Sequence, residues 1–143
     1  MQSKKIHAKS FRDLEAYQKA HFLAQDIYDL TKVFPKEETY SLTDQLRRSS
    51  RSAGAQIAEA WGKRRYERHF ISKLTDADAE QMETQHWLGV AASCEYLSHD
   101  QTEHLISELS RVGRMLNSMM RKADLFCRKS DTAGQGEEEV TDD

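Results

Sequence analysis

Residues 105–126 read LISELSRVGRMLNSMMRKADLF, and this stretch decides the fold. Apolar side chains recur in it at alternating steps of four and three residues, at Leu105, Leu109, Val112, Leu116, Met119, Ala123 and Phe126. Such steps place side chains on one face of an α-helix, and their regular alternation is the heptad pattern of helices packed at a shallow crossing angle. The stretch therefore predicts a helix that packs lengthwise against other helices.

Three earlier segments also show helical spacing, over residues 11–34, 41–62 and 66–94. The first ends at the only proline of the chain, Pro35, which marks a polar connection. Ser41 is expected to cap the second helix, and Ser98 with Gln101 has the spacing of a capping box before the fourth. The second helix has a face rich in small residues, which predicts the close approach of a neighbour: Leu42, Leu46, Ser49, Ser50, Ala53, Ile57, Ala60 and Trp61.

The third helix is more polar than the others. Several of its residues 80–86 must therefore be hydrogen-bonded inside the bundle or at a subunit interface, because a packed helix cannot turn all of them to solvent. Its core candidates are Phe70, Ile71, Leu74, Ala77, Met82, Trp87, Leu88 and Ala91.

The composition favours one helical domain. The 143 residues include one proline, and no apolar run approaches the roughly 20 residues that span a bilayer. No signal peptide is evident, so a cytoplasmic location without membrane contact is expected. Cys94 and Cys127 cannot build a disulfide framework or a cysteine-ligated zinc module and are expected in the core.

These observations predict an all-α protein with an up-down-up-down antiparallel four-helix bundle over residues 11–126. Residues 1–10 are expected to be a flexible basic N-terminus, and residues 127–143 a disordered acidic tail. The tail has two basic and six acidic side chains, a net charge of −4, so residues 1–126 carry +1 of the whole-chain charge of −3. The overall acidity therefore comes from the tail.

Six blocks of sequence occur in a fixed order: FRDLEAYQKA (11–20), FPKEETYSLT (34–43), QLRRS (45–49), IAE (57–59), ETQ (83–85) and GRMLN (113–117). Together they resemble the small bacterial four helix bundle protein family, which includes proteins encoded in intervening sequences of 23S ribosomal RNA genes. The chain departs from the family at Gln56 and Ala60, where asparagine and glycine are usual, and near Gly54, where a proline is expected.

The resemblance implies a ring-like homopentamer without enzymatic activity. The family is also similar in fold to the accessory protein of diversity-generating retroelements, a basic pentamer that binds nucleic acid and a reverse transcriptase. This fold-level analogy favours nucleic-acid binding without establishing it.

Basic residues are concentrated in residues 47–73, which contain eight basic and two acidic side chains. Grouped cations bind phosphates, and arginines beside aromatic residues such as Trp61 or Tyr66 also stack on bases. The predicted nucleic-acid-binding residues are Arg47, Arg48, Arg51, Lys63, Arg64, Arg65 and Arg68. The alternative interpretation is a solvated face whose cations pair with acidic residues of other helices or subunits.

Catalytic and metal signals are weak. Glu83 and His86 have the Glu-x-x-His spacing of di-iron bundles, but the chain has no second copy, so structural hydrogen bonding is the preferred interpretation. Arg64 and His69 fit the Arg-x4-6-His pattern of HEPN-type ribonucleases, a spacing that arises easily by chance. No phosphate-binding glycine loop is present. No catalytic residue, metal, cofactor or small-molecule substrate is therefore predicted.

The leading hypothesis is a self-assembling, non-enzymatic bundle, expected to be a pentamer, with a basic surface for RNA or DNA. A purely protein-binding assembly module is the alternative, and a HEPN-like ribonuclease is the less favoured one.

Overall fold

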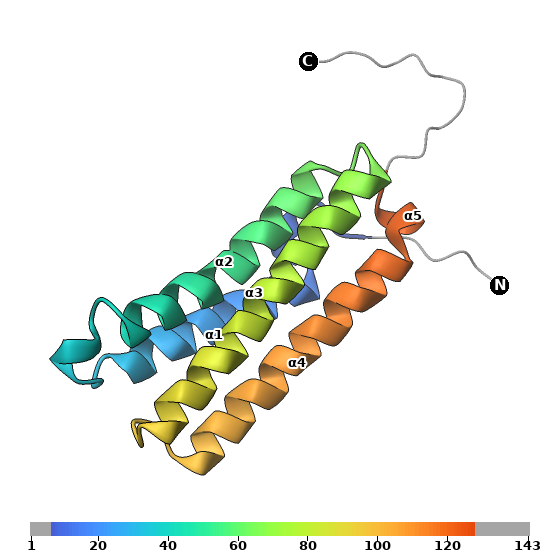
Figure 1. Cartoon of the computed structure of the whole chain (residues 1–143). Helices are drawn as coiled ribbons and strands as arrows, with labels where there is room; N and C mark the ends of the chain where they lie inside the picture. The colour runs from blue at the N-terminus through green and yellow to red at the C-terminus, as the bar shows by residue number, and fades with distance from the viewer. Residues whose placement is uncertain (1–6, 128–143) are drawn as a thin grey trace, which may run out of the picture.

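The computed structural model of the protein describes residues 7–127 and is helical throughout, with no strand in that range. Four long helices, α1 (Glu15–Thr31), α2 (Leu42–Gly62), α3 (Glu67–Ser93) and α4 (His99–Arg121), are followed by the short α5 (Ala123–Phe126) (Figure 1). Two 3-10 turns, η1 (Phe11–Asp13) and η2 (Lys36–Glu38), flank α1. The predicted all-α four-helix bundle is confirmed.

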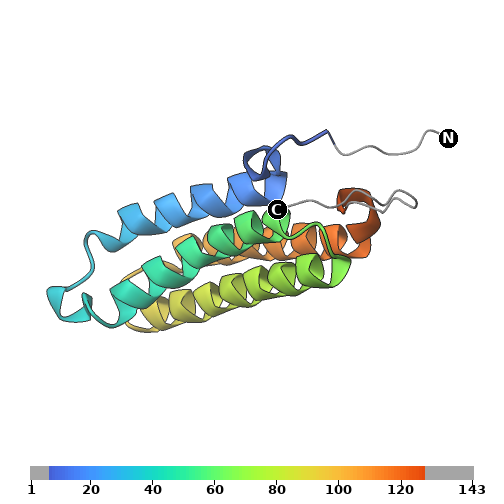
Figure 2. The same ribbon diagram turned by 90° about the horizontal axis from the view of Figure 1, so that it is seen from above.

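Each long helix packs against its neighbour in the chain, and α1 also packs against α4, which closes the bundle. The helices run side by side in both views (Figures 1 and 2). Because successive helices alternate in direction, the start of α1, the turn between α2 and α3, and the end of α4 lie at one end of the bundle. We call this end the α2–α3 turn end.

The heptad pattern of α4 is confirmed. Its five predicted positions from Leu105 to Met119 are buried. The last two, the buried Ala123 and the half-buried Phe126, lie in α5, because the helix breaks at Lys122 instead of continuing to Phe126 as predicted. The predicted capping box is also present, since the Gln101 amide donates to the Ser98 hydroxyl at 3.0 Å and the Ser98 amide donates to the Gln101 side chain at 2.9 Å. This pair satisfies two backbone donors at the first turn of α4.

The small-residue face of α2 is buried, as predicted. Ser49, Ser50, Ala53 and Gly54 all lie in the interior. The Thr84 hydroxyl of α3 donates a 2.8 Å hydrogen bond to the Ser49 hydroxyl. Short side chains at this position let the two helix backbones approach, and the hydroxyl pair satisfies polar atoms that would otherwise be costly to bury.

Polar residues of α3 take part in the packing with α4, as predicted. The buried Gln81 donates from Nε2 to the Asp78 carboxylate at 2.8 Å, and Gln85 donates to Oε1 of Gln81, also at 2.8 Å. Gly113 of α4 leaves room for this chain, because a Cβ atom at Gly113 would lie 2.7 Å from the Gln81 Nε2.

Two predictions about burial are wrong. Met82 is exposed, because the buried face of α3 runs through Ala77, Gln81 and Thr84, and Met82 lies about 100° around the helix from Gln81. Cys94 is also exposed, since α3 ends at Ser93 and Cys94 belongs to the turn, while Cys127 is half-buried; both thiols are free.

Both predicted ends of the first helix and the predicted side-chain cap of the second are also wrong. The first helix does not run over residues 11–34, because Leu14 is extended between η1 and α1, and α1 ends at Thr31. Ser41 precedes α2 but makes no capping hydrogen bond, and its hydroxyl donates to the Glu38 carboxylate at 2.8 Å instead. The predicted N-terminal arm and acidic tail fall mostly in residues 1–6 and 128–143, outside the described range.

Among the helices of residues 7–127, none combines the length and the apolar character needed to cross a lipid bilayer.

Candidate nucleic-acid interface

The seven predicted basic residues fall into two separate groups. Arg47, Arg48 and Arg51 lie on the first half of α2, whereas Lys63, Arg64, Arg65 and Arg68 surround the α2–α3 turn. The 16 residues from Arg47 to Lys63 correspond to about 24 Å along a helix axis. The structure therefore does not gather the predicted residues into one patch.

Arg48 is committed to an ion-pair network between α2 and α3. Its guanidinium lies 2.6 Å from the Glu83 carboxylate and 3.5 Å from that of Glu80. The hydrogen bond from the Trp87 indole and the one from Arg48 hold the pKa of Glu83 below its ordinary value. The hydrogen bond to Glu83, followed by the charges of Glu80 and Glu83, raises the pKa of Arg48. For Arg48, the alternative interpretation of pairing with another helix is correct.

Arg47 and Arg51 converge on one aromatic ring of α1. The Arg47 guanidinium carbon lies 4.5 Å from the Tyr28 ring centroid and that of Arg51 lies 5.3 Å from it. Arg47 is half-buried and donates to the Thr31 hydroxyl and the Tyr28 carbonyl, at 2.8 and 3.3 Å. Arg51 is exposed, and within residues 7–127 neither arginine forms an ion pair.

The second group, which we call the turn cluster, consists of Lys63, Arg64, Arg65 and Arg68. Lys63, Arg65 and Arg68 are exposed, and the described part of the chain offers none of them an ion pair. Arg64 is ordered differently, since its guanidinium stacks 3.6 Å from the Trp61 ring centroid and donates to the Trp61 carbonyl at 2.8 Å. Three cations of the turn cluster thus face solvent without an ion pair in this part of the chain, although the charge of Lys63 also acts on Glu59.

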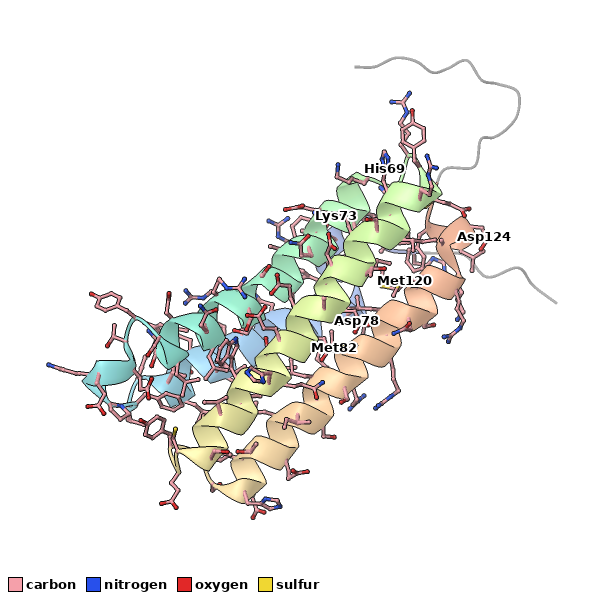
Figure 3. All side chains as sticks on the ribbon, viewed as in Figure 1. His69, Lys73, Asp78, Met82, Met120 and Asp124 are labelled. Atoms are coloured by element: carbon pink, nitrogen blue, oxygen red, sulfur yellow. The ribbon has the colours of Figure 1, made fainter. Side chains whose placement is uncertain are left out.

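Lys73, one turn of α3 beyond His69, is not part of this group (Figure 3). It pairs with Glu59 at 2.8 Å and with Asp76 at 3.7 Å. The hydrogen bond from Lys73, followed by its charge and that of Lys63, lowers the pKa of Glu59. Lys73 therefore already has carboxylate partners and adds no unpaired cation to the turn cluster.

In the Glu-x-x-His and Arg-x4-6-His motifs, the predicted residues contact other side chains instead of forming a shared site in residues 7–127. Glu83 is occupied by Arg48 and Trp87, while the His86 ring contacts Trp87 edge-on at 4.6 Å. Residues 7–127 contain no group of three or more histidine, cysteine, aspartate or glutamate side chains placed to hold a metal ion. Arg64 contacts Trp61, whereas the His69 ring contacts Tyr66 at 5.3 Å.

Sequence reasoning missed the role of Tyr28. Tyr28 contacts Arg47, which lies 19 residues later in the sequence and on another helix. No local sequence pattern therefore links the two residues. It also missed a cavity of about 490 Å³ at the α2–α3 turn end, between the start of α1 and the end of α4. Its lining includes Met115, Met119 and Phe126.

Comparison with known proteins identifies a family and a similar solved structure. The family described as 23S rRNA-intervening sequence protein matches residues 12–118. A crystal structure of a protein with unknown function from the S23 ribosomal protein family, from Bacteroides thetaiotaomicron, is 29% identical, with a TM-score of 0.67. The alignment covers 74% of this chain and 95% of that one. No curated protein matches the chain.

Proposed function

The chain belongs to the family of 23S rRNA-intervening sequence proteins, and from this premise we propose that it is a non-enzymatic, self-assembling bundle that binds nucleic acid. The observation that carries the proposal is the turn cluster, in which Lys63, Arg65 and Arg68 are exposed and form no ion pair among residues 7–127. Cations left unpaired on a surface are available to phosphates.

The rigid backbone around the turn cluster supports this role. Arg68 belongs to the first turns of α3, Lys63 directly follows α2, and the turn between them is held by a hydrogen bond from the Tyr66 amide to the Lys63 carbonyl at 3.3 Å. The stacked pair of Arg64 and Trp61 gives the turn cluster an aromatic neighbour. Phosphate contacts of this kind position a nucleic acid without reading its sequence.

Self-assembly is proposed from the family resemblance and from exposed apolar side chains. Phe22 on α1 and Met82 on α3, which are 63% and 56% exposed, are the apolar side chains that we propose for contact with another copy. A ring-like homopentamer would repeat the turn cluster five times and raise the avidity for an extended polyanion. Sizing by light scattering, with and without RNA, measures both the assembly and its complex.

The test of nucleic-acid binding is charge reversal in the turn cluster. The variant Arg65→Glu/Arg68→Glu should lose most of its RNA affinity and show a shallower dependence of affinity on salt. The matched control is Lys36→Glu/Arg114→Glu, which makes the same change in net charge at exposed residues outside the turn cluster and should bind as the natural chain does. Affinity that does not change with salt, or equal losses in both variants, would overturn the proposal.

The competing function is an assembly module that binds only protein, which the exposed Phe22 and Met82 also favour. In that case Arg51→Glu should break the oligomer, whereas nucleic-acid binding through the turn cluster predicts an intact oligomer that still binds RNA. A sizing column with the ratio of absorbance at 260 and 280 nm separates the two outcomes.

A further inference from the structure

A strip of aromatic rings and arginines runs along the outer junction of α1 and α2, and we propose that it binds single-stranded nucleic acid, with bases on the rings and phosphates on the arginines. This inference rests on the proposed function, because it names the form of nucleic acid and a second contact surface for it. We call this surface the α1–α2 strip; its members are Phe11, Arg12, Tyr17, His21, Tyr28, Arg47 and Arg51.

The aromatic members lie on one face of α1 and its preceding turn. Tyr17, His21 and Tyr28 are separated by four and seven residues, which places them along one side of the helix. The Tyr17 and His21 rings are nearly parallel, 18° apart in plane with centroids at 6.0 Å, and the Phe11 ring meets Tyr17 edge-on at 4.9 Å. Tyr17 to Tyr28 spans about 16 Å of helix.

The facing side of α2 is built from small residues. A Cβ atom at Gly54 would lie 3.6 Å from the Tyr17 ring, so α2 approaches that ring with backbone alone. Ala55 is exposed and Ala58 is half-buried, one turn further along. His21 is exposed and Tyr17 is half-buried, so both residues keep accessible surface beside this close approach of the helices.

Arginines stand at both ends of the aromatic run. The Arg12 guanidinium lies 4.5 Å from the Phe11 ring centroid at one end, and Arg47 and Arg51 lie over Tyr28 at the other. None of the three forms an ion pair within residues 7–127. The Lys32 ammonium, which pairs with Asp29 at 3.4 Å, also lies 5.0 Å from the Tyr28 ring centroid. Three cations thus gather at this ring, and a bound phosphate would neutralise part of their charge.

This combination favours single strands over duplexes. Bases of a single strand are free to stack on aromatic rings and on guanidinium planes, whereas those of a duplex are already stacked on one another. A cationic groove lined with aromatic rings is the common feature of proteins that bind single strands without sequence preference. Trp61, seven residues beyond Gly54 on the same side of α2, continues the run of rings toward the turn cluster.

The experiment uses the full chain and fluorescently labelled oligonucleotides. Anisotropy is measured with 12-nucleotide oligo(U) and oligo(dT), and with a 12-base-pair RNA duplex, over a range of salt concentrations. The natural chain should bind a single strand at least ten-fold more tightly than the duplex. The RNA and DNA strands show whether the 2′-hydroxyl contributes, and tight binding of either one supports the inference.

Two exposed members of the strip are changed so that the fold is spared. His21→Ala should weaken single-strand binding about five-fold, as expected for the loss of one stacked base, and leave duplex binding unchanged. Arg51→Gln should lower the slope of log affinity against log salt by about 0.7, the value for one phosphate of a single strand. The matched controls, His104→Ala and Arg114→Gln, remove the same groups from exposed positions on α4 and should bind as the natural chain does.

The outcomes separate the inference from the function on which it depends. The α1–α2 strip is not the binding surface if the natural chain binds the duplex as tightly as the single strands, or if His21→Ala and Arg51→Gln bind like their controls. The turn cluster would then remain as the proposed nucleic-acid site, with its own test. If the natural chain binds none of the oligonucleotides, the proposed function and this inference both fail.

Discussion

The packing of α3 against α4 requires a glycine at position 113, although nothing about a position inside a helix suggests this by itself. The missing side chain of Gly113 leaves space for Gln81, which is buried and hydrogen-bonded to Asp78 and Gln85. We predict that Gly113→Ala lowers the free energy of unfolding by about 1 kcal/mol, because Gln81 must leave a hydrogen bond to make room. Urea denaturation measures the change.

Gly89 of α3 is the control, since no atom of its surroundings lies within 4 Å of a Cβ placed there. Gly89→Ala should raise the free energy of unfolding by about 0.5–1 kcal/mol, the ordinary gain of alanine in a helix. Stabilisation by both substitutions would show that the Gln81 chain adjusts without loss.

Glu83 makes the stability of the bundle dependent on pH. Its pKa lies below the ordinary 4.5 because Trp87 and Arg48 donate to the ionised carboxylate. A lowered carboxyl pKa contributes stability above the pKa of the unfolded chain, and that contribution disappears as the pH falls through the folded value. Glu83→Gln should therefore destabilise the protein most above about pH 4.5, and its effect should shrink as the pH falls toward 3.

Urea denaturation of Glu83→Gln at pH 7 and pH 3 checks this prediction. Glu103→Gln on α4 is the control, because Glu103 is exposed and has no hydrogen bond or ion pair in residues 7–127. An equal loss for Glu83→Gln at both pH values would contradict the assigned role of the carboxylate.

Individual residues also show where sequence reasoning reached its limit. Met82 was predicted in the core because it is apolar, but the inner face of α3 continues through Gln81 and Thr84, which are polar. A rule that follows apolar residues skips such positions and takes a neighbour instead. That some polar residues between 80 and 86 are hydrogen-bonded inside was predictable; which ones are was not.

At the scale of the helices, the caps of α4 and α2 provide a paired test. Ser98→Ala removes the hydroxyl that accepts from the Gln101 amide and should cost about 1 kcal/mol of unfolding free energy. Ser41→Ala should change it by less than about 0.5 kcal/mol, because Ser41 makes no capping hydrogen bond to α2. Thermal denaturation followed by circular dichroism compares the two variants. Equal losses would mean that the two serines contribute alike.

The helices themselves were largely predictable, and the basic site was predictable only in composition. The heptad of α4 needs nothing beyond its own spacing, so its buried positions from Leu105 to Met119 were predictable, whereas the break at Lys122 before α5 was not. The basic residues follow no such rule. Whether Arg48 meets a carboxylate and Arg65 does not depends on the position of Glu83, 35 residues after Arg48, on a neighbouring helix. Pairing across helices is a property of the packed bundle.

At the scale of the whole molecule, the distribution of charge predicts an effect of the chain end. Residues 128–143 carry a net charge of −4, whereas residues 1–127 carry +1. Removing residues 128–143 should therefore increase the affinity for RNA several-fold at low salt, and the gain should shrink as salt screens the charges. Anisotropy at about 50 and 300 mM salt measures the gain.

The control for this prediction keeps the length of the chain. Replacing Glu137, Glu138 and Glu139 with glutamine should reproduce part of the gain, because it removes three of the six acidic charges of residues 128–143. Unchanged affinity in both variants would show that these charges do not act on the binding surface.

An even number of antiparallel helices brings the first and last described residues to the same place. His7 and Ala8 line the same cavity as Phe126, although more than a hundred positions separate them in the sequence. The connection between α1 and α2, over residues 32–41, lies at the opposite end. The helices can therefore be joined in a different order along the chain without changing their arrangement in space. A circular permutant that begins at α2 and finishes with α1 would form the same bundle, and its new ends would lie far from the turn cluster.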